Sequence, residues 1–451
     1  MRVLIIGMGY VGLNTAVVLS YLGHEVTCVD VNVEKIKLLQ AGITPIYEPH
    51  LDELFKQVKD KIKFTSSYDT ADIPSTEVVF IAVGTPALAD GSANLEYVRQ
   101  AAESISERLG EDFTVVVNKS TVPIGSGNWV GAIIKQHYEE THGKKSNGLF
   151  SVVSNPEFLK QGAALHDSFY PDRIVIGSDD PEATARLETL FDRLIKQNFT
   201  SPEGLPRPHD VKEVPVLVCD LTSAEMIKYA ANAFLALKIS FINEIGHLAQ
   251  KVGGDVNAIA KGIGLDNRIG PAFLNAGIGW GGSCFGKDTA ALISTAQEYK
   301  LAMPIIQAAR EVNYNQRIWV VDALQESLKI LKGRRIALLG FSFKPNTDDL
   351  RDAPSLDISR LLLMRGAIVR AHDPIALDNA RRQYPDMGVT YCQDVEDALD
   401  EAEAIVLVTE WPTYRELDWS KITPVPIVDG RNFLDRDRLT ELGFTVIGVG
   451  R

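Results

Sequence analysis

A glycine-rich turn near the start of the chain constrains the fold more than any other feature. Residues 2–6 (RVLII) read as a buried strand, Gly7-Met8-Gly9-Tyr10-Val11-Gly12 forms the turn, and a helix is expected over about 13–22. A second strand over 25–30 ends at Asp30. Strand, tight turn, helix and strand form the repeating unit of a parallel sheet. The chain is therefore expected to begin with a doubly wound α/β domain.

The three glycines and Asp30 have the spacing of a dinucleotide site. Such glycines permit a tight turn, close approach of the backbone to a pyrophosphate, and close packing of helix on strand. Asp30, 18 residues after Gly12, can accept hydrogen bonds from both ribose hydroxyls and would repel a 2′-phosphate, so NAD is favoured over NADP. The alternative is that the glycines serve packing alone. The candidate cofactor-binding residues here are Gly7, Gly9, Tyr10, Val11, Gly12 and Asp30.

The remaining periodicity divides the chain into three parts. Further apolar, β-branched runs lie at 78–83, 114–117, 151–153 and 173–177, with a helical stretch at 94–109. The proline-rich segment 197–215 reads as a surface loop, and helices are expected at 222–251, 287–300 and 304–331. Segments 334–343, 365–374 and 403–411 then echo the first strands, but without G-x-G-x-x-G. This last part should therefore not bind a dinucleotide in the same way as the first.

We expect two Rossmann-like doubly wound domains, 1–215 and 332–451, joined by a helical section over 216–331 with a long central helix.

Composition narrows the choice of partners and compartment. The net charge of the 451 residues is −13, which argues against nucleic acid or an anionic membrane as the main partner. The four cysteines lie far apart without a C-x-x-C pair, so we expect neither a disulfide framework nor a zinc site. This cysteine usage favours a location in the reducing cytoplasm. Residues 3–23 are apolar enough to resemble a signal peptide, but the glycine spacing favours the nucleotide turn.

Cys284 lies in a second glycine-rich segment, 281–288 (GGSCFGKD), ahead of an expected helix. A helix N-terminus favours a thiolate, and Lys228 could help to activate it. Asp288 opposes this activation unless it orients water. The alternative is a small buried hydrophobe, which is the reading we adopt for Cys28 and Cys219. A nucleophilic thiol beside a hydride acceptor would allow an alcohol to be oxidised to an acid.

Other polar residues are candidate site residues because of their positions in the sequence. Lys228 and Asn232 share one face of a mostly apolar helix, which suggests a pocket, although a surface lysine is more common. Glu157 could serve as an acid or base, or as a cap. Loops 84–86 and 120–123 follow strands, where ligands bind to parallel sheets, but both could be ordinary turns. After strands of the last part come three cations suited to a diphosphate or to plain surface exposure: Lys344, Arg351 and Arg431.

Together these segments resemble the UDP-glucose/GDP-mannose dehydrogenase family over nearly the whole chain. The resemblance is carried by GMGYVGL (7–13), STVPIGSG (120–127), NPEFLKQGAAL (155–165), AEMIKYAANAFLALKISFINEI (224–245), RIGPAFLNAGIGWGGSCFGKD (268–288), FKPNTDDLRDAPS (343–355) and TEW…DGR (409–431).

The resemblance implies a role for each matching residue. It implies that Cys284 is the nucleophile, that Lys228 and Asn232 stabilise an oxyanion, that Glu157 is an acid/base group, and that Thr121 and Asp288 position water. NAD contacts are implied for Asp30, Lys35, Thr85, Ser120, Gln161 and Arg351. Nucleotide-sugar contacts are implied for Glu157, Phe158, Leu159, Lys228, Asn232, Arg268, Asn275, Gly279, Gly281, Phe343, Lys344 and Arg431. No metal is implied.

Two positions depart from the family pattern. Many relatives carry glutamate where this chain has Gln161, so a cofactor contact there would lack a charge. Gly286 often corresponds to Pro or Gln, which predicts a looser turn after Cys284.

The expected reaction is NAD-dependent oxidation of UDP-glucose to UDP-glucuronate in a cytoplasmic dimer or higher oligomer, with Arg268 reaching a second subunit. GDP-mannose and UDP-N-acetylhexosamine are the rival substrates. A nucleotide-sugar epimerase would require Tyr-x-x-x-Lys, and none of the thirteen tyrosines has lysine four residues later. A non-catalytic NAD-binding regulator would have no use for the Lys228, Asn232 and Cys284 set.

Overall fold

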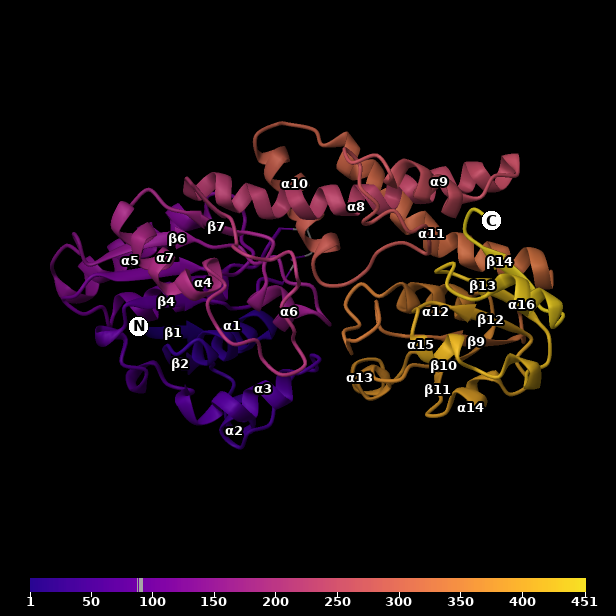
Figure 1. The fold of residues 1–451 in the computed structure, drawn as a ribbon, viewed down its shortest axis with the longest axis horizontal. Coiled ribbons are helices and arrows are strands. Elements are labelled where there is room, and N and C mark those ends of the chain that lie inside the picture. Colours follow the sequence, from indigo (N-terminus) through magenta and orange to yellow (C-terminus); the bar gives the residue numbers. More distant parts are fainter. Residues whose placement is uncertain (87, 89–91) are drawn as a thin grey trace. The chain divides into compact units, whose positions relative to one another are not determined.

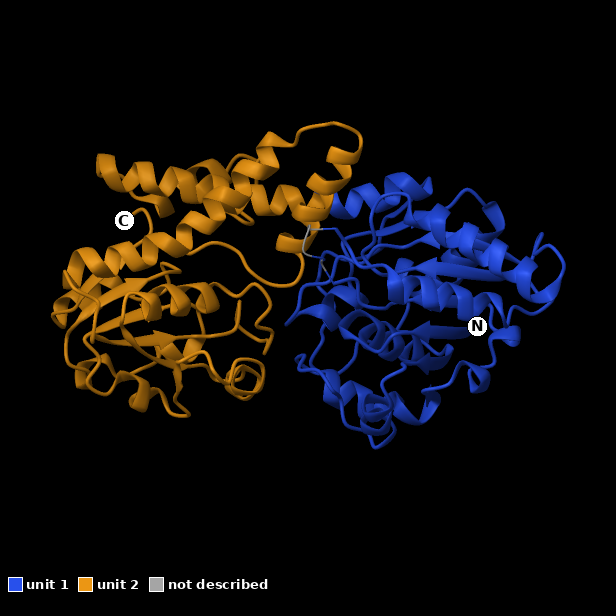
Figure 2. Cartoon of the chain, turned by 180° about the vertical axis from the view of Figure 1, so that it is seen from behind, with its two compact units in different colours: residues 1–230 blue, residues 231–451 orange. Residues whose placement is uncertain are grey.

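The computed structural model describes residues 1–86, 88 and 92–451. The chain forms two compact units, Met1–Ala230 and Ala231–Arg451 (Figure 2). Each unit holds one α/β sheet, and a helical region separates the two sheets along the sequence (Figure 1). The expected fold class is therefore confirmed.

The first unit contains an eight-stranded sheet in the order β3-β2-β1-β4-β5-β6-β7-β8. Its strands are β1 (Arg2–Ile6), β2 (Glu25–Val29), β3 (Ile62–Thr65), β4 (Val78–Ile81), β5 (Thr114–Asn118), β6 (Phe150–Ser154), β7 (Ile174–Gly177) and β8 (Val216–Cys219). The sequence analysis did not predict β3, and β8 is the apolar strand in which Cys219 was expected to lie. The segment 197–215 contains no helix or strand.

One pairing in this sheet departs from the expected parallel arrangement. β6 and β7 pair antiparallel through Ser154 and Gly177, whereas the other pairs are parallel. A parallel neighbour requires a long crossover, usually a helix that returns the chain to the start of the strand. The helix between β6 and β7 is α6 (Ala164–Phe169), whose six residues span only about 9 Å. It is too short for that return.

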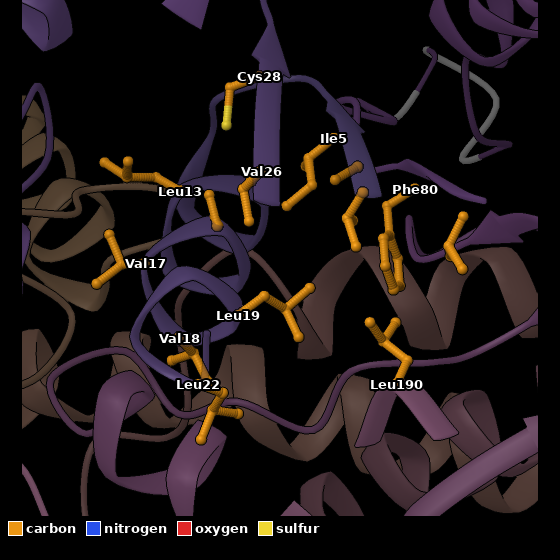
Figure 3. Close-up of a cluster of buried hydrophobic side chains, with 14 of the residues drawn as sticks. Ile5, Leu13, Val17, Val18, Leu19, Leu22, Val26, Cys28, Phe80 and Leu190 are labelled. Carbon is orange, nitrogen blue, oxygen red and sulfur yellow. The ribbon is translucent and has the colours of Figure 1, made fainter. Parts of the chain in front are cut away.

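Helices cover this sheet and bury its apolar faces. They are α1 (Tyr10–Tyr21), α2 (Val33–Gln40), α3 (Leu51–Val58), α4 (Glu96–Ser106), α5 (Ser126–His142), α6 and α7 (Pro181–Ile195). In one core cluster, Ile5, Leu13, Cys28, Phe80 and Leu190 point toward one another from strands and helices (Figure 3). All five are at most 1% exposed. Cys28 is the small buried hydrophobe that its apolar strand predicted.

The helical region contains the expected long helix, α8 (Leu221–Val252), which runs across the boundary between the units. It is followed by α9 (Val256–Gly264), α10 (Phe285–Glu298) and α11 (Pro304–Leu328). The predicted helices at 222–251, 287–300 and 304–331 match α8, α10 and α11, and α9 was not predicted. Among the described residues, no helix has both the length and the apolar character that crossing a membrane requires.

The second unit contains a six-stranded parallel sheet in the order β11-β10-β9-β12-β13-β14. Its strands are β9 (Arg335–Leu339), β10 (Ile368–His372), β11 (Thr390–Tyr391), β12 (Ala404–Leu407), β13 (Pro426–Asp429) and β14 (Thr445–Gly448). Its helices are α12 (Pro354–Met364), α13 (Leu377–Gln383), α14 (Val395–Leu399), α15 (Pro412–Arg415) and α16 (Arg436–Glu441).

The turn after β9 repeats the backbone of the turn after β1 but differs at the acid. The Gly340 N–H donates to the His372 carbonyl at 2.8 Å, as the Gly7 N–H donates to the Val29 carbonyl at 2.7 Å. Asp373, the counterpart of Asp30, is 2% exposed. Both of its oxygens accept backbone N–H groups, and one also accepts from the Trp411 indole. The protein's own donors thus occupy both oxygens of this carboxylate.

Candidate active site

The fingerprint turn in the first unit has two glycines that the fold requires and one that leaves space for a ligand. Gly7 has a φ of +97°, and a Cβ on Gly12 would lie 1.9 Å from the Gly7 carbonyl oxygen. A Cβ on Gly9 would meet nothing within 4 Å. Packing alone therefore explains Gly7 and Gly12 but not Gly9. An open glycine at a helix N-terminus fits a pyrophosphate.

Asp30 is held at the end of β2, where the ribose of a dinucleotide would lie. Its Oδ2 accepts the Met8 N–H at 2.8 Å and the Lys35 ammonium at 2.6 Å, and its Oδ1 accepts the Asn32 N–H at 2.9 Å. The structure therefore brings together Asp30 and Lys35, two of the residues expected to contact the cofactor. Lys35 partly offsets the charge with which Asp30 would repel a 2′-phosphate.

The loops after β4 and β5 are joined by side-chain hydrogen bonds. The Thr85 hydroxyl donates to the Thr121 carbonyl at 2.7 Å, and the Ser120 hydroxyl donates to the Val83 carbonyl at 2.7 Å. These contacts fix both loops at the carboxyl edge of the sheet, where ligands bind to parallel sheets. The expected candidates Thr85, Ser120 and Thr121 thus lie together.

Sequence reasoning missed Glu48, which links the fingerprint turn to the loop over 155–163. The Tyr10 hydroxyl donates to Glu48, and the Gly162 and Ala164 N–H groups donate to the same carboxylate at 2.7 Å each. Burial, with the charge of Glu48 beside it, raises the pKa of Tyr10 far above its usual value. Glu48 lies outside any helix or strand, so no periodicity indicated its burial. Gln161, an expected cofactor contact, immediately precedes Gly162.

Glu157 and Lys228 form a buried ion pair, at 8% and 4% exposure. The Lys228 ammonium donates to Glu157 Oε1 at 3.0 Å, and the Leu159 N–H donates to Oε2 at 2.7 Å. Burial favours the protonated acid, but Lys228, this N–H and Lys119 outweigh it and lower the pKa of Glu157. The ring centroid of Phe158 lies 5.5 Å from the ammonium. Lys228 is therefore no surface lysine, and its buried charge is compensated as such charges require.

Cys284 immediately precedes α10 and is partly exposed, whereas Cys28 and Cys392 are buried. Cys219 on β8 is also partly exposed, so the prediction that it is a small buried hydrophobe is wrong. The Cys284 Sγ lies 3.6 Å from the Ser283 hydroxyl. Although burial opposes the shift, Asp349 raises the pKa of the Arg351 guanidinium, and Cys284 acts in the same direction as Asp349. A cation and a helix N-terminus both stabilise a thiolate. By contrast, burial raises the pKa of the Cys28 thiol well above its usual value.

The turn before Cys284 is packed against the segment 343–352. A Cβ on Gly281 would lie 2.3 Å from the Asp352 carbonyl oxygen, and one on Gly282 would lie 2.7 Å from the Phe343 ring. The Gly282 N–H donates to the Arg351 carbonyl at 2.9 Å. These contacts place Phe343 and Arg351 beside the cysteine turn. A Cβ on Gly286, in the first turn of α10, would lie 2.7 Å from Asp352 Oδ2.

Asn232 and Asp288 meet directly in the second unit. The Asn232 amide donates to Asp288 Oδ2 at 2.6 Å, and the Lys287 ammonium lies 2.8 Å from Oδ1. Asp288 is 1% exposed and lies on α10, in the turn that follows Cys284. Two predicted site residues that are 56 positions apart in sequence are thus in contact.

Five of the twelve residues expected to bind the nucleotide sugar gather at the carboxyl edge of the second sheet: Gly279, Gly281, Phe343, Lys344 and Arg431. Arg431, after β13, donates to the Val408 carbonyl at 2.8 Å and to the Gly279 carbonyl at 3.0 Å. The Lys344 ammonium lies 5.6 Å from the Phe343 ring centroid. Arg268 is not part of this group: its side chain is 89% exposed and pairs with Asp266, and Asn275 is also exposed. No cluster of metal-ligating side chains occurs in the residues that the structure describes.

Three family models match consecutive parts of the chain. The NAD binding domain of the UDP-glucose/GDP-mannose dehydrogenase family matches residues 1–195, the central domain 222–315, and the UDP binding domain 337–436.

Individual relatives match over full length. UDP-glucose 6-dehydrogenases of Bacillus subtilis and Rhizobium meliloti are each 42% identical to this chain, and both matches cover all of it. The matches cover 98% of the Bacillus subtilis protein and 100% of the Rhizobium meliloti protein. The structure of a UDP-glucose dehydrogenase from Pyrobaculum islandicum is 40% identical, covers 97% of this chain and 95% of its own, and has a TM-score of 0.87. The chain therefore belongs to the UDP-glucose/GDP-mannose dehydrogenase family of NAD-dependent oxidoreductases.

Proposed function

We propose that this protein oxidises UDP-glucose to UDP-glucuronate, using two molecules of NAD for each sugar. The observation that carries the proposal is the full-length likeness to UDP-glucose 6-dehydrogenases at about 40% identity. The partly exposed Cys284 at the start of α10 supports it, because oxidation past the aldehyde benefits from a covalent adduct.

The first oxidation takes a hydride and a proton from the sugar's terminal CH2OH group. NAD supplies the hydride acceptor in this step and in the second oxidation. We assign the proton to the Glu157–Lys228 pair, whose buried charges are already hydrogen-bonded. An aldehyde results.

The second oxidation takes place while the sugar carbon is bound to the cysteine sulfur. The Cys284 thiolate adds to the aldehyde carbon, and the resulting oxyanion takes a proton to give a thiohemiacetal. Loss of a second hydride and of this proton gives a thioester, and water then cleaves the carbon–sulfur bond to release the acid and the thiol. We assign the oxyanion to Lys228 and Asn232, one turn apart on α8, and the orientation of water to Thr121 and Asp288.

The remaining assignments follow the same likeness. NAD would lie on the fingerprint turn, with contacts from Asp30, Lys35, Thr85, Ser120, Gln161 and Arg351. The sugar nucleotide would be held by the loop 157–159 and by Asn275, Gly279, Gly281, Phe343, Lys344 and Arg431. The division into parts 1–215, 216–331 and 332–451, and a location in the cytoplasm, complete the proposal.

We also propose that two copies of the chain pair through α8. Exposed apolar side chains recur along this helix at spacings of four to eight residues, close to one or two turns, and form a stripe that water would otherwise cover: Met226, Phe234, Phe241, Leu248 and Val252. Arg268, whose side chain is 89% exposed, is then available to the partner's substrate. Changing Phe234 and Phe241 to Glu should shift the molar mass measured by light scattering to that of a monomer. An unchanged mass would contradict pairing through α8.

The reaction is tested by counting NADH for each sugar consumed, with UDP-glucose, GDP-mannose and a UDP-N-acetylhexosamine as rival substrates. UDP-glucose should give the highest kcat/KM and two NADH. Cys284→Ala should form no acid, whereas Cys219→Ala, a matched change on β8, should retain full yield. Normal acid yield from Cys284→Ala would reject the covalent route, and absence of NADH with every sugar would reject the enzyme assignment and favour a regulator.

A further inference from the structure

Lys119 is a cation beside the Glu157–Lys228 pair that the proposed reaction has not used. It directly follows β5, and its backbone N–H donates to the Ile81 carbonyl at 3.0 Å, which places it at the carboxyl edge of the first sheet. Its ammonium donates to Asn155 Oδ1 at 2.8 Å. The Asn155 amide nitrogen donates to the Val175 carbonyl at 2.8 Å, which fixes the direction of that amide. Lys119 is thus held toward the loop that carries Glu157.

Lys119 and Glu157 line the same cavity of about 100 Å³. Such a volume holds roughly three water molecules. Other walls carry charged side chains from the loop after β6, from α6 and from the segment before β7: Lys160, Asp167, Asp172 and Arg173. Among these, Lys160 pairs with Asp167 at 3.3 Å, Arg173 lies over the Phe158 ring at 3.8 Å, and Asp172 is largely exposed. These contacts engage or screen the other charges, which leaves Lys119 and Lys228 as the cations facing Glu157.

Two cations therefore share one buried carboxylate. Although the cavity leaves part of Lys119 accessible, burial lowers the pKa of its ammonium to about 8; Lys228 acts in the same direction and Glu157 opposes it. In return, Lys119 contributes to lowering the pKa of Glu157.

We propose that Lys119 is a positioning residue for the proposed reaction: its ammonium group holds the Glu157 carboxylate against Lys228 and completes a cluster of two cations and one carboxylate that takes up the proton of the sugar hydroxyl. The inference rests on the proposed function, in which Glu157 and Lys228 handle that proton. Lys119 acts through them and contacts no reacting atom. Its charge matters most at acidic and neutral pH, where the ammonium is intact.

The test compares Lys119→Met, which removes the charge, with Lys119→Arg, which keeps it. In the pH profile of kcat/KM, the acidic limb of Lys119→Met should move upward by about one pH unit, the low end of the effect of a neighbouring charge. Above pH 8 its rate should approach that of the wild type, which then loses the same charge. Lys119→Arg should keep the wild-type acidic limb. A loss by the same factor at every pH, or no loss, would overturn the proposal.

A second measurement needs neither turnover nor the Met variant. In protein labelled with ¹³C-lysine, the Lys119 Cε signal, assigned by its absence from Lys119→Arg, should titrate near pH 8 and at lower pH in Glu157→Gln. A midpoint near the usual lysine pKa of about 10.4, or one that Glu157→Gln leaves unchanged, would refute the cluster. If the titration is as expected but no sugar yields NADH, the cluster stands and the proposed function fails.

Discussion

Glu225 makes the stability of the first unit depend on pH in a predictable direction. This side chain of α8 is 3% exposed and accepts the Gly125 and Gly127 N–H groups at 2.6 and 2.7 Å, at the start of α5. Burial raises its pKa to about 7, although both N–H groups oppose the shift. A carboxyl group whose pKa is raised on folding stabilises the fold at low pH, and this contribution is lost as the pH rises through the folded value.

The size of the effect follows from the shift. The difference between about 7 and the usual 4.5 corresponds to about 3 kcal/mol, at about 1.36 kcal/mol for each pH unit. Between pH 5 and pH 8, roughly 2 to 3 kcal/mol of this should be lost, because part is already gone at pH 5. Glu225→Gln cannot ionise, so it should escape this loss. Its missing acceptor imposes a cost that does not vary with pH.

The assay is urea unfolding of wild type and Glu225→Gln at pH 5 and pH 8, followed by circular dichroism. The free energy of unfolding of the variant relative to wild type should rise by about 2 to 3 kcal/mol between the two pH values. Glu188→Gln, a change of the same type at an exposed position of α7, should show no such rise. A constant difference between Glu225→Gln and wild type would mean that the two N–H groups outweigh burial and keep Glu225 ionised, which would refute the argument.

Three further predictions concern the turn and core of the first unit. Gly9→Ala should leave the melting temperature within about 2 °C of wild type, because its Cβ meets no protein atom, but it should weaken NAD binding measured by calorimetry. Gly12→Ala should destabilise the unit, because its Cβ would lie 1.9 Å from the Gly7 carbonyl oxygen. Equal melting temperatures of the two variants would contradict this reasoning. Asp30→Asn should lower kcat/KM for NAD more than for NADP, and an unchanged ratio would remove Asp30 from the ribose site. Phe80→Ala should cost about 3–5 kcal/mol in urea unfolding, since Phe80 is fully buried, and a cost below about 1 kcal/mol would mean that the core refills the space.

Much of the fold was accessible from the sequence because its signals are local. The run RVLII with its glycine turn predicted β1 and α1, and the long stretch without proline predicted α8 to within one residue at each end. The short strand β3 (Ile62–Thr65), in which a lysine interrupts the apolar pattern, carried too little periodicity to be identified. The direction of β7 was also missed, because it depends on the helix within the connection rather than on the strand itself.

The sequence by itself determined the elements, the glycine turns and the residue types available for chemistry, because backbone conformation and apolar periodicity are properties of neighbouring positions. Only the tertiary structure decided which charges meet. Lys119 and Glu48 had no distinguishing pattern, yet each is held by partners more than 30 positions away. Their importance arises from burial, which makes an ion seek compensation, and burial is set by segments that are remote in the chain.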